Sequence, residues 1–245
     1  MLTPRERRLL RDFERLKALR TSWSLFHFQC ADLSAAEATE FLRTKLSFDV
    51  IKNALPGFLE PSAFERQHPG APPEKYLVIY TCKGLARADN GDIKETSLHA
   101  MEIVFGWDYP SKPPTFIWHT PIWHPNFKQP YICMQGRPFA IGLTLDQIVL
   151  EVGRMIQYQN YNVNDPLNQE AADWARQNPR RFPVDDRDLL DSRKRVGEGS
   201  GKAAPSYKLV ELVPPQGVAL RGPDQLIELT ETAAGNQPRP KQNPT

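Results

Sequence analysis

The stretch Asp108–Cys133, DYPSKPPTFIWHTPIWHPNFKQPYIC, sets a His-Pro-Asn turn a few residues before a lone cysteine. A cysteine can be a core hydrophobe, a metal ligand, half of a disulfide or a nucleophile, so its neighbours must decide its role. Prolines at 125, 130 and 138 surround the thiol and favour stiff loops that hold the sulfur at the surface. The stretch therefore predicts an accessible Cys133.

The composition of the whole chain is that of a globular protein. The 245 residues are 40% hydrophobic and 24% charged, with a net charge of +2. These values allow a packed core and do not favour a surface built to neutralise phosphates. The three cysteines are widely spaced and odd in number, unlike a secreted disulfide framework. No apolar run approaches the roughly 18 residues of a membrane span. We therefore expect a soluble, cytoplasmic protein that binds neither nucleic acid nor membrane.

The order of the expected elements is helix, antiparallel strands, then helices, which predicts an α+β fold. The first helix begins at Pro4, where Thr3 and Glu6 form a capping box. Further helices are expected from Ser34 to about Leu46, after the capping box Thr144–Gln147, and from Pro166, capped by Asp165, to about Gln177. Strands are expected over Trp23–Cys30, Tyr76–Cys82, Leu98–Phe105 and Thr115–His119, with Asp89-Asn90-Gly91 turning a hairpin between the second and the third.

A change of composition divides the chain into two parts. Residues 1–186 are expected to form the folded domain, with an insertion over about 31–74. Residues 187–245 are rich in Ser, Gly, Lys, Pro and Gln, which is typical of a flexible tail. Two apolar pieces interrupt the tail, Tyr207–Val213 and Leu226–Leu229, and they either pair as a small hairpin or add to the sheet edge of a partner.

Several motifs in order resemble the ubiquitin-conjugating enzymes. Tyr109-Pro110 and Pro113-Pro114 match the turn before a strand, followed by the His-Pro-Asn motif and an Ile132-Cys133 pair. The helix RERRLLRDFERLKAL and the loop Asn162–Leu167 are also similar to their counterparts in the family. The resemblance covers about residues 4–30 and 75–178. It implies a ubiquitin-conjugating-like fold, with a four-stranded antiparallel sheet flanked by an N-terminal helix and C-terminal helices.

The resemblance also implies a set of site residues. Cys133 would carry a ubiquitin-like protein as a thioester and pass it to an amine, most simply a lysine. Asn126 would donate to the oxyanion of that step, or would only tie the turn together. Asp165 would orient the lysine or accept its proton, or would only cap a helix. Support residues around the thiol would be His124 and Pro125, which stabilise the turn, and Asn162, which shapes the pocket.

The same resemblance implies the partners: a ubiquitin-like modifier, its activating enzyme and a protein target. The basic face of the first helix, Arg5, Arg8, Arg11 and Arg15, is expected either to dock the activating enzyme or to be a solvated surface. ATP would be used by the activating enzyme, so this chain needs no cofactor and no metal.

The sequence departs from the family pattern around the thiol. The loops on either side are short and Ser111 replaces the usual aromatic, so we do not expect dependence on a RING-type ligase. Such divergence resembles bacterial ubiquitin-like operons, some of them linked to antiphage defence. Three alternatives remain: a non-catalytic binding module, a cysteine hydrolase using His124 or His119, and a zinc site of those residues with Cys133. The other cysteines, Cys30 and Cys82, are predicted to be buried.

Overall fold

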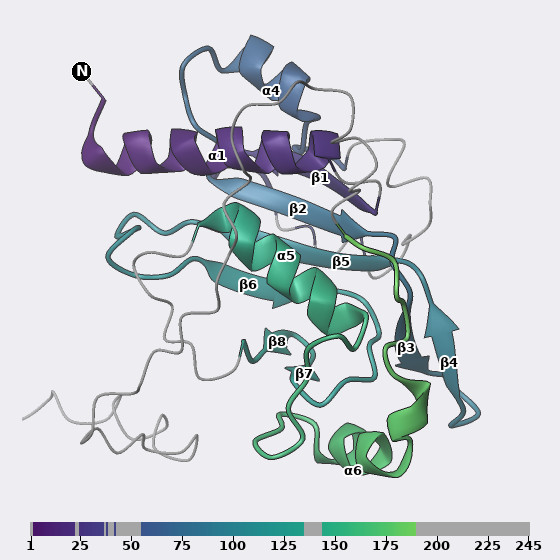
Figure 1. The fold of residues 1–245 in the computed structure, drawn as a ribbon. Helices are drawn as coiled ribbons and strands as arrows, with labels where there is room; N and C mark the ends of the chain where they lie inside the picture. Colours follow the sequence, from purple (N-terminus) through teal and green to yellow (C-terminus); the bar gives the residue numbers. More distant parts are fainter. Residues whose placement is uncertain are drawn as a thin grey trace, which may run out of the picture. The chain divides into compact units, whose positions relative to one another are not determined.

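The computed structural model describes residues 2–22, 25–36, 38, 42, 55–134 and 144–189 (Figure 1). The helices are α1 (Pro4–Ser22), α4 (Pro61–Gln67), α5 (Leu145–Ile156) and α6 (Gln169–Gln177), followed by a 3-10 turn, η1 (Pro179–Arg181). The strands are β1 (Phe26–Ala31), β2 (Lys75–Tyr80), β3 (Gly84–Arg87), β4 (Ile93–Thr96), β5 (His99–Val104), β6 (Thr115–Trp118), β7 (Phe127–Lys128) and β8 (Tyr131–Ile132).

Four strands form the central antiparallel sheet in the order β1-β2-β5-β6, so the predicted α+β architecture is confirmed. The predicted strands are present with shifted ends, and β2 stops at Tyr80 rather than at Cys82. All six residues of β2 are buried, because this strand is central and both faces of the sheet are covered. Residues 23 and 24 of the first predicted strand lie outside the described residues.

Helices α1 and α5 cover one face of the sheet, as Figure 1 shows. Leu9, Phe13 and Leu16 recur at helical spacing on α1 and are buried in the main core. The predicted capping box at the start of α1 is present. The Thr3 backbone N–H donates to Glu6 at 2.7 Å, and the Glu6 N–H donates to the Thr3 hydroxyl at 3.2 Å.

A buried carboxylate ties α1 to its neighbours. Asp12 is fully buried and accepts hydrogen bonds from the Tyr109 hydroxyl at 2.5 Å and from the Arg8 guanidinium at 2.8 Å. The Leu145 N–H at the start of α5 also approaches Asp12, at 3.4 Å. Burial, and then the hydrogen bond with Asp12, raises the pKa of Tyr109. One side chain therefore sets the position of α1 against both α5 and the loop before β6.

The opposite face of the sheet is covered by part of the 31–74 region. Leu55 and Phe58 pack there with Leu77 and Ile79 of β2. Most of the predicted helix from Ser34 to Leu46 lies outside the described residues; Ser34 itself is in a turn, and the Leu42 N–H donates to the Ala38 carbonyl at 3.0 Å.

Polar side chains of the sheet anchor this covering segment. Gln29 accepts from the Leu55 N–H at 3.1 Å, and the buried Glu102 accepts from the Ala38 N–H at 3.3 Å. Helix α4, within the same region, was not predicted.

The predicted Asp89-Asn90-Gly91 turn exists, but it connects strands other than those expected. It joins β3 to β4, a separate two-stranded sheet, whereas β2 and β5 pair directly in the central sheet. The Thr81 N–H still donates to the Leu25 carbonyl of the neighbouring strand segment, and after it the chain leaves β2 and folds into the extra hairpin. Gly91 has φ of +86°, a conformation that glycine adopts without strain.

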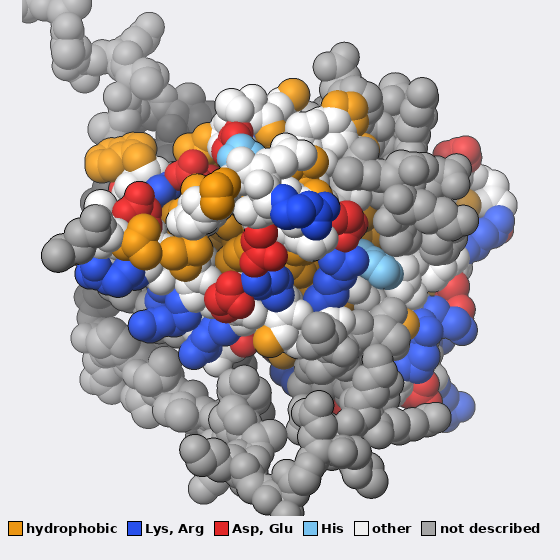
Figure 2. Space-filling view, turned by 90° about the horizontal axis from the view of Figure 1, so that it is seen from above, with side chains coloured by type: hydrophobic (Ala, Val, Ile, Leu, Met, Phe, Trp, Pro, Cys, Tyr) orange, Lys and Arg blue, Asp and Glu red, His pale blue; other side chains and the backbone are white. Residues whose placement is uncertain are grey.

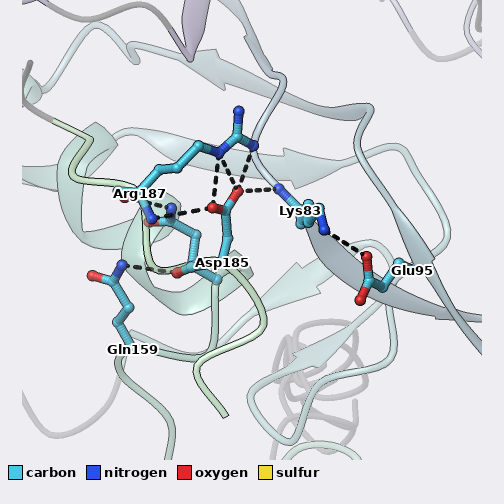
Figure 3. A network of polar contacts seen from close by, with 6 residues as sticks. Lys83, Glu95, Gln159, Asp185 and Arg187 are labelled. Carbon is cyan, nitrogen blue, oxygen red and sulfur yellow. Dashed lines mark hydrogen bonds and ion pairs between the residues drawn. The ribbon is translucent and has the colours of Figure 1, made fainter. Parts of the chain in front are cut away.

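A polar network holds this hairpin against the segment after α6 (Figure 3). The Asp185 carboxylate accepts from the Lys83 backbone N–H at 2.7 Å and from the Arg187 guanidinium at 2.6 Å. Gln159, after α5, donates to the Asp185 carbonyl at 3.1 Å. Burial alone would raise the pKa of Asp185, but the hydrogen bonds from Arg187 and Lys83 outweigh it and the pKa is lowered.

The packing of the domain continues beyond residue 186, where its end was expected. Leu189 is buried in the main core. The rest of the predicted tail, 190–245, lies outside the described residues, as do both of its apolar pieces. Among the described helices, none has the length and apolar character needed to cross a bilayer.

Gly84 offers a test of this packing. A Cβ atom at this position would lie 2.8 Å from Ile156 Cγ2 and 2.9 Å from the His99 ring, both of which are fixed in the core. We expect Gly84→Ala to lower the free energy of unfolding by about 1–3 kcal/mol in a denaturant titration. Ala86→Ser, on the same strand but partly exposed, is the matched control. Equal stability of the Gly84 variant and the wild type would contradict this packing.

Candidate active site

A tight hairpin presents Cys133. Strands β7 and β8 pair Lys128 with Tyr131, so Gln129 and Pro130 form the turn between them. The Cys133 N–H then donates to the Asn126 carbonyl at 2.8 Å and extends the ladder by one bond. The short gap between Asn126 and Cys133, unusual for the family, therefore places the two residues in direct backbone contact.

Alternation along β8 turns the thiol outward. Ile132 and Met134 pack against the main core, whereas Tyr131 is 67% exposed and Cys133 is partly exposed. Successive side chains of a strand point to opposite sides, so Tyr131 and Cys133 share the outer side. Cys133 is thus partly exposed as a residue, and the accessibility of its sulfur stays a prediction.

The other two cysteines are buried, as predicted. Cys30 and Cys82 are both inaccessible to solvent, and burial raises the pKa of each thiol to about 12. Neither can form a thiolate near neutral pH, so Cys133 is the one cysteine of this chain suited to nucleophilic chemistry.

Asn126 forms a two-bond clasp with Asn162. The side-chain Oδ1 of Asn126 accepts from the Asn162 N–H at 2.9 Å, and its Nδ2 donates to the Asn162 carbonyl at 3.3 Å. Asn126 has no exposed surface. In this geometry Asn126 ties the turn to the segment of Asn162. Its oxyanion role stays a prediction.

Two further bonds join the same segments. The Asn168 N–H donates to the Pro125 carbonyl at 2.9 Å, and the Tyr158 hydroxyl donates to the Trp123 carbonyl. Tyr158 has φ of +56°, an uncommon conformation for a non-glycine residue, and its ring stacks on Phe182 at 4.4 Å. The strain at Tyr158 persists because this packing and the hydroxyl bond fix the residue.

His124 is a structural residue of the turn, consistent with the implied support role. Its Nδ1 accepts from the Asn126 N–H at 3.0 Å, and its ring packs against Phe127 and Tyr158. Burial lowers the pKa of His124 to about 3, although nearby backbone carbonyls favour the protonated form. A histidine whose acceptor nitrogen is occupied and whose pKa is so low cannot serve as the base of a cysteine hydrolase.

His119, the alternative base and zinc ligand, is engaged elsewhere. Its Nε2 lies 3.2 Å from a carboxylate oxygen of the fully buried Glu102. Its backbone carbonyl accepts from the Gln129 side chain at 3.0 Å, which supports the turn of the β7–β8 hairpin. Within the described ranges, no group of three or more His, Cys, Asp or Glu residues could hold a metal ion.

The prediction that Asp165 caps the next helix is wrong. Helix α6 begins at Gln169, and Asn168 is its N-cap, accepting from the Ala171 N–H at 3.1 Å. Asp165 instead lies exposed in the loop between Asn162 and the helix. An exposed carboxylate that caps nothing remains available to an incoming amine, so its catalytic role stays a prediction.

The basic face of α1 is partly committed to the domain itself. Arg5 pairs with Glu74 at 2.6 Å and donates to the Gly106 carbonyl at 3.1 Å, while Arg8 bonds to the buried Asp12. These two arginines therefore hold α1 in place, whatever else they contact.

The remaining arginines of that face are exposed. Arg15 is 47% exposed and lies 3.9 Å from Asp146, and Arg11 is also exposed. Figure 2, which views the molecule from above, shows Lys and Arg side chains mixed with Asp and Glu side chains on this surface. Docking of an activating enzyme here stays a prediction. Arg11 and Arg15 are more available for such a contact than Arg5 and Arg8.

The comparisons with known proteins match the part of the chain that carries these motifs. The sequence model described as "Ubiquitin-conjugating enzyme" matches residues 79–187. The probable ubiquitin-conjugating enzyme E2 31 of Arabidopsis thaliana is 31% identical over 112 residues, which are 44% of this chain and 70% of the plant protein. The chain belongs to the ubiquitin-conjugating enzyme family.

Solved structures of ubiquitin-conjugating enzymes are also similar. Ubc12 of S. cerevisiae is 18% identical, with 75% of each chain covered and a TM-score of 0.43. The E2 domain of a Toxoplasma gondii ubiquitin conjugating enzyme is 23% identical, covering 45% of this chain and 75% of that domain, with a TM-score of 0.33. Because both scores are below 0.5, family membership rests on the sequence match.

Two residues that support the turn before Cys133 were missed in the sequence. Tyr158 binds the turn through its hydroxyl, and Asn168 binds it through its backbone N–H. Asn168 is a residue type that commonly caps helices, but the Asp165-Pro166 pair was the stronger pattern for a helix start in the sequence. The conformation of Tyr158 has no local signal. Residues 135–143, directly after Met134, lie outside the described residues.

The buried histidines predict acid sensitivity. Burial lowers the pKa of His99 to about 4 and that of His124 to about 3, so below pH 6.5 the unfolded chain binds protons that the folded chain does not. Stability should therefore fall as the pH drops from 7.5 to 5, by about 2 kcal/mol for each histidine.

Urea titrations at pH 7.5, 6 and 5 measure this loss, and His99→Asn should remove about half of it. A stability that does not change over this range would show that the two imidazoles are not held neutral in the folded state.

Proposed function

We propose that the protein is a ubiquitin-like conjugating enzyme that carries the modifier on Cys133. The observation that supports this most strongly is the partial exposure of Cys133 directly after the β7–β8 hairpin, in a chain whose other two cysteines are buried. The runner-up, a non-catalytic binding module, gives no reason for a partly exposed cysteine at this position.

The proposed reaction has two acyl transfers. The Cys133 thiolate attacks the carbonyl carbon of the thioester on the activating enzyme, and the thiolate of that enzyme leaves. An amine of the target then attacks the new thioester, the Cys133 thiolate leaves, and the amine nitrogen loses a proton to give an amide. Both steps pass through an oxyanion, and neither needs a cofactor or a metal on this chain.

Asn126 has two proposed parts in this reaction. Its clasp with Asn162 fixes the strand that carries the thiol. An amide nitrogen has two N–H groups, and one Nδ2–H is used by the Asn162 carbonyl. The second is the proposed donor to the oxyanion, where such a bond contributes about 3–4 kcal/mol.

Asp165 is the proposed guide for the acceptor. Neutral pH is about 3.4 units below the ordinary pKa of a lysine side chain, so removing its proton costs about 4.6 kcal/mol. A carboxylate by itself favours the charged ammonium, so the contribution of Asp165 is orientation of the amine and acceptance of its proton during attack. Its exposed position in the loop after Asn162 is compatible with that contribution.

The partners in this proposal are a ubiquitin-like modifier, an activating enzyme docked on the basic face of α1, and a protein target. The antiphage role belongs to the same proposal and is supported only by the departures of the loops from the family pattern. An adjacent gene for an adenylating enzyme and one for a small β-grasp protein would support it.

The thioester is tested directly by mixing the protein with an activating enzyme, its modifier and ATP. We expect an adduct on a gel that reductant removes. Cys133→Ala should abolish it, and Cys133→Ser should replace it with an oxyester that resists reductant, because an ester oxygen is not exchanged by thiols. Cys82→Ala is the matched control. An adduct that persists in Cys133→Ala would exclude this cysteine.

The division of roles is tested by single-turnover discharge. Asn126→Ala and Asp165→Ala should still accept the modifier, but should transfer it to lysine at least 10-fold more slowly, since each removes a group that acts on the second step. Asp186→Ala, an exposed carboxylate elsewhere, is the control. Loss of charging in the two site variants would contradict this assignment.

A further inference from the structure

A groove lies between the β3–β4 hairpin and α6, elements that lie side by side at the lower right of Figure 1. Its volume is about 730 Å³, in the range of sites that bind a side chain or a small ligand. The lining residues that matter here are Arg87 and Trp123 on one side, Glu170 and Trp174 on α6, and Arg181 after it.

Two arginines lie over two tryptophans in this groove. The Arg87 guanidinium is 5.3 Å from the centre of the Trp123 ring, and the Arg181 guanidinium is 5.1 Å from that of Trp174. Stacking holds a guanidinium by its face and leaves its N–H groups free to donate at the edge. The groove therefore presents two ordered cationic donors.

The carboxylates that line the groove have hydrogen-bond partners, whereas one of its arginines has no carboxylate partner. Its three carboxylates already have donors: Glu170 pairs with Arg87 at 2.8 Å, Asp173 pairs with Arg176, and Asp92 accepts from Asn90. By contrast, no carboxylate of the described residues lies within ion-pair distance of Arg181. Arg181 is thus a cation of this groove that has no anionic partner among the described residues.

Arg87, the other arginine of the groove, has Glu170 as its anionic partner. This ion pair crosses the groove from α6 to β3, and the Glu170 and Arg87 side chains are 72% and 53% exposed. An exposed ion pair contributes little to stability, so a carboxylate from another molecule can replace Glu170 at small cost.

Chain connectivity limits the distance between one residue of the groove and Cys133. Trp123 is separated from Asn126 by three peptide units, and the Asn126 carbonyl accepts from the Cys133 N–H at 2.8 Å. Chain geometry therefore places the Cα atoms of Trp123 and Cys133 at most about 18 Å apart. An extended segment of about five residues spans that distance.

We propose that this groove binds a carboxylate side chain of the protein substrate, in an acidic segment roughly four to six residues from the acceptor amine. This inference rests on the proposed conjugating function and adds the class of substrate. Arg87 and Arg181 are the donors, and Trp123 and Trp174 are the rings over which these guanidinium groups lie.

The test measures binding of a 13-residue peptide with one lysine and two glutamates five residues away, and of the same peptide with glutamines. The full chain is used, and tryptophan fluorescence reports the dissociation constant. The glutamate peptide should bind about 10-fold more tightly, with an advantage that shrinks as salt is added. Equal affinities for the two peptides would overturn the proposal.

Variants separate the groove from general electrostatics. Arg87→Gln and Arg181→Gln should each remove at least 5-fold of the preference for glutamate, whereas Arg180→Gln, an exposed neighbour that does not line the groove, should leave it unchanged. Glu170→Gln should strengthen binding about 3-fold, because it frees Arg87. An Arg180 effect as large as that of Arg181, or weaker binding by Glu170→Gln, would contradict the proposal.

A twelve-residue oligothymidylate serves as the competitor. We expect it to bind more weakly than the glutamate peptide; if it binds more tightly and Arg181→Gln abolishes its binding, the groove is a nucleic-acid site instead. None of these measurements uses the modifier, so failure of Cys133 to form a thioester would not change them.

Discussion

The clasp between Asn126 and Asn162 is the interaction on which the geometry of the site depends. It joins two segments that are 36 residues apart and both irregular, one leading to the thiol and the other leading to α6. Because the Asn126 backbone carbonyl binds the Cys133 N–H, the same residue connects the strand of the thiol to the loop that holds Asp165. A buried amide that satisfies a backbone N–H and a backbone C=O at once would leave both unpaired if it were removed.

The rest of the domain gives the clasp a fixed base. Asp12 links α1, α5 and the Tyr109 loop, and Asp185 links the β3–β4 hairpin to the segment after α6. Each is a carboxylate with little or no exposed surface that accepts at least one hydrogen bond from an element distant in the sequence. Apolar packing is not directional, whereas these hydrogen bonds fix the helices and the hairpin at definite positions relative to the sheet. None of the hydrogen bonds named here uses the thiol of Cys133, as the proposed chemistry requires.

The parts of the fold that were predictable are those with a local cause. The Thr3–Glu6 capping box depends on residues three apart, and the strands that build the sheet are recognised by their apolar runs. The exposure of Cys133 follows from the turn before it and from the alternation of β8. The choice of Asn168 over Asp165 as a cap could not be read in this way, because both are good capping residues and the deciding bond reaches Pro125. The β3–β4 hairpin was missed because its strands are only four residues long, and its pairing competed with longer neighbours.

Amide hydrogen exchange tests the central claim, that one clasp holds the thiol strand and the acceptor loop as a unit. The account predicts that the N–H groups of Asn162, Cys133 and Asn168 are protected about equally in the wild type. In Asn126→Ala all three should become fast together, while the N–H of Leu77 in the central sheet keeps its protection. Fast exchange at Asn162 in the wild type, or unchanged protection of Cys133 and Asn168 in the variant, would show that the two segments are held independently.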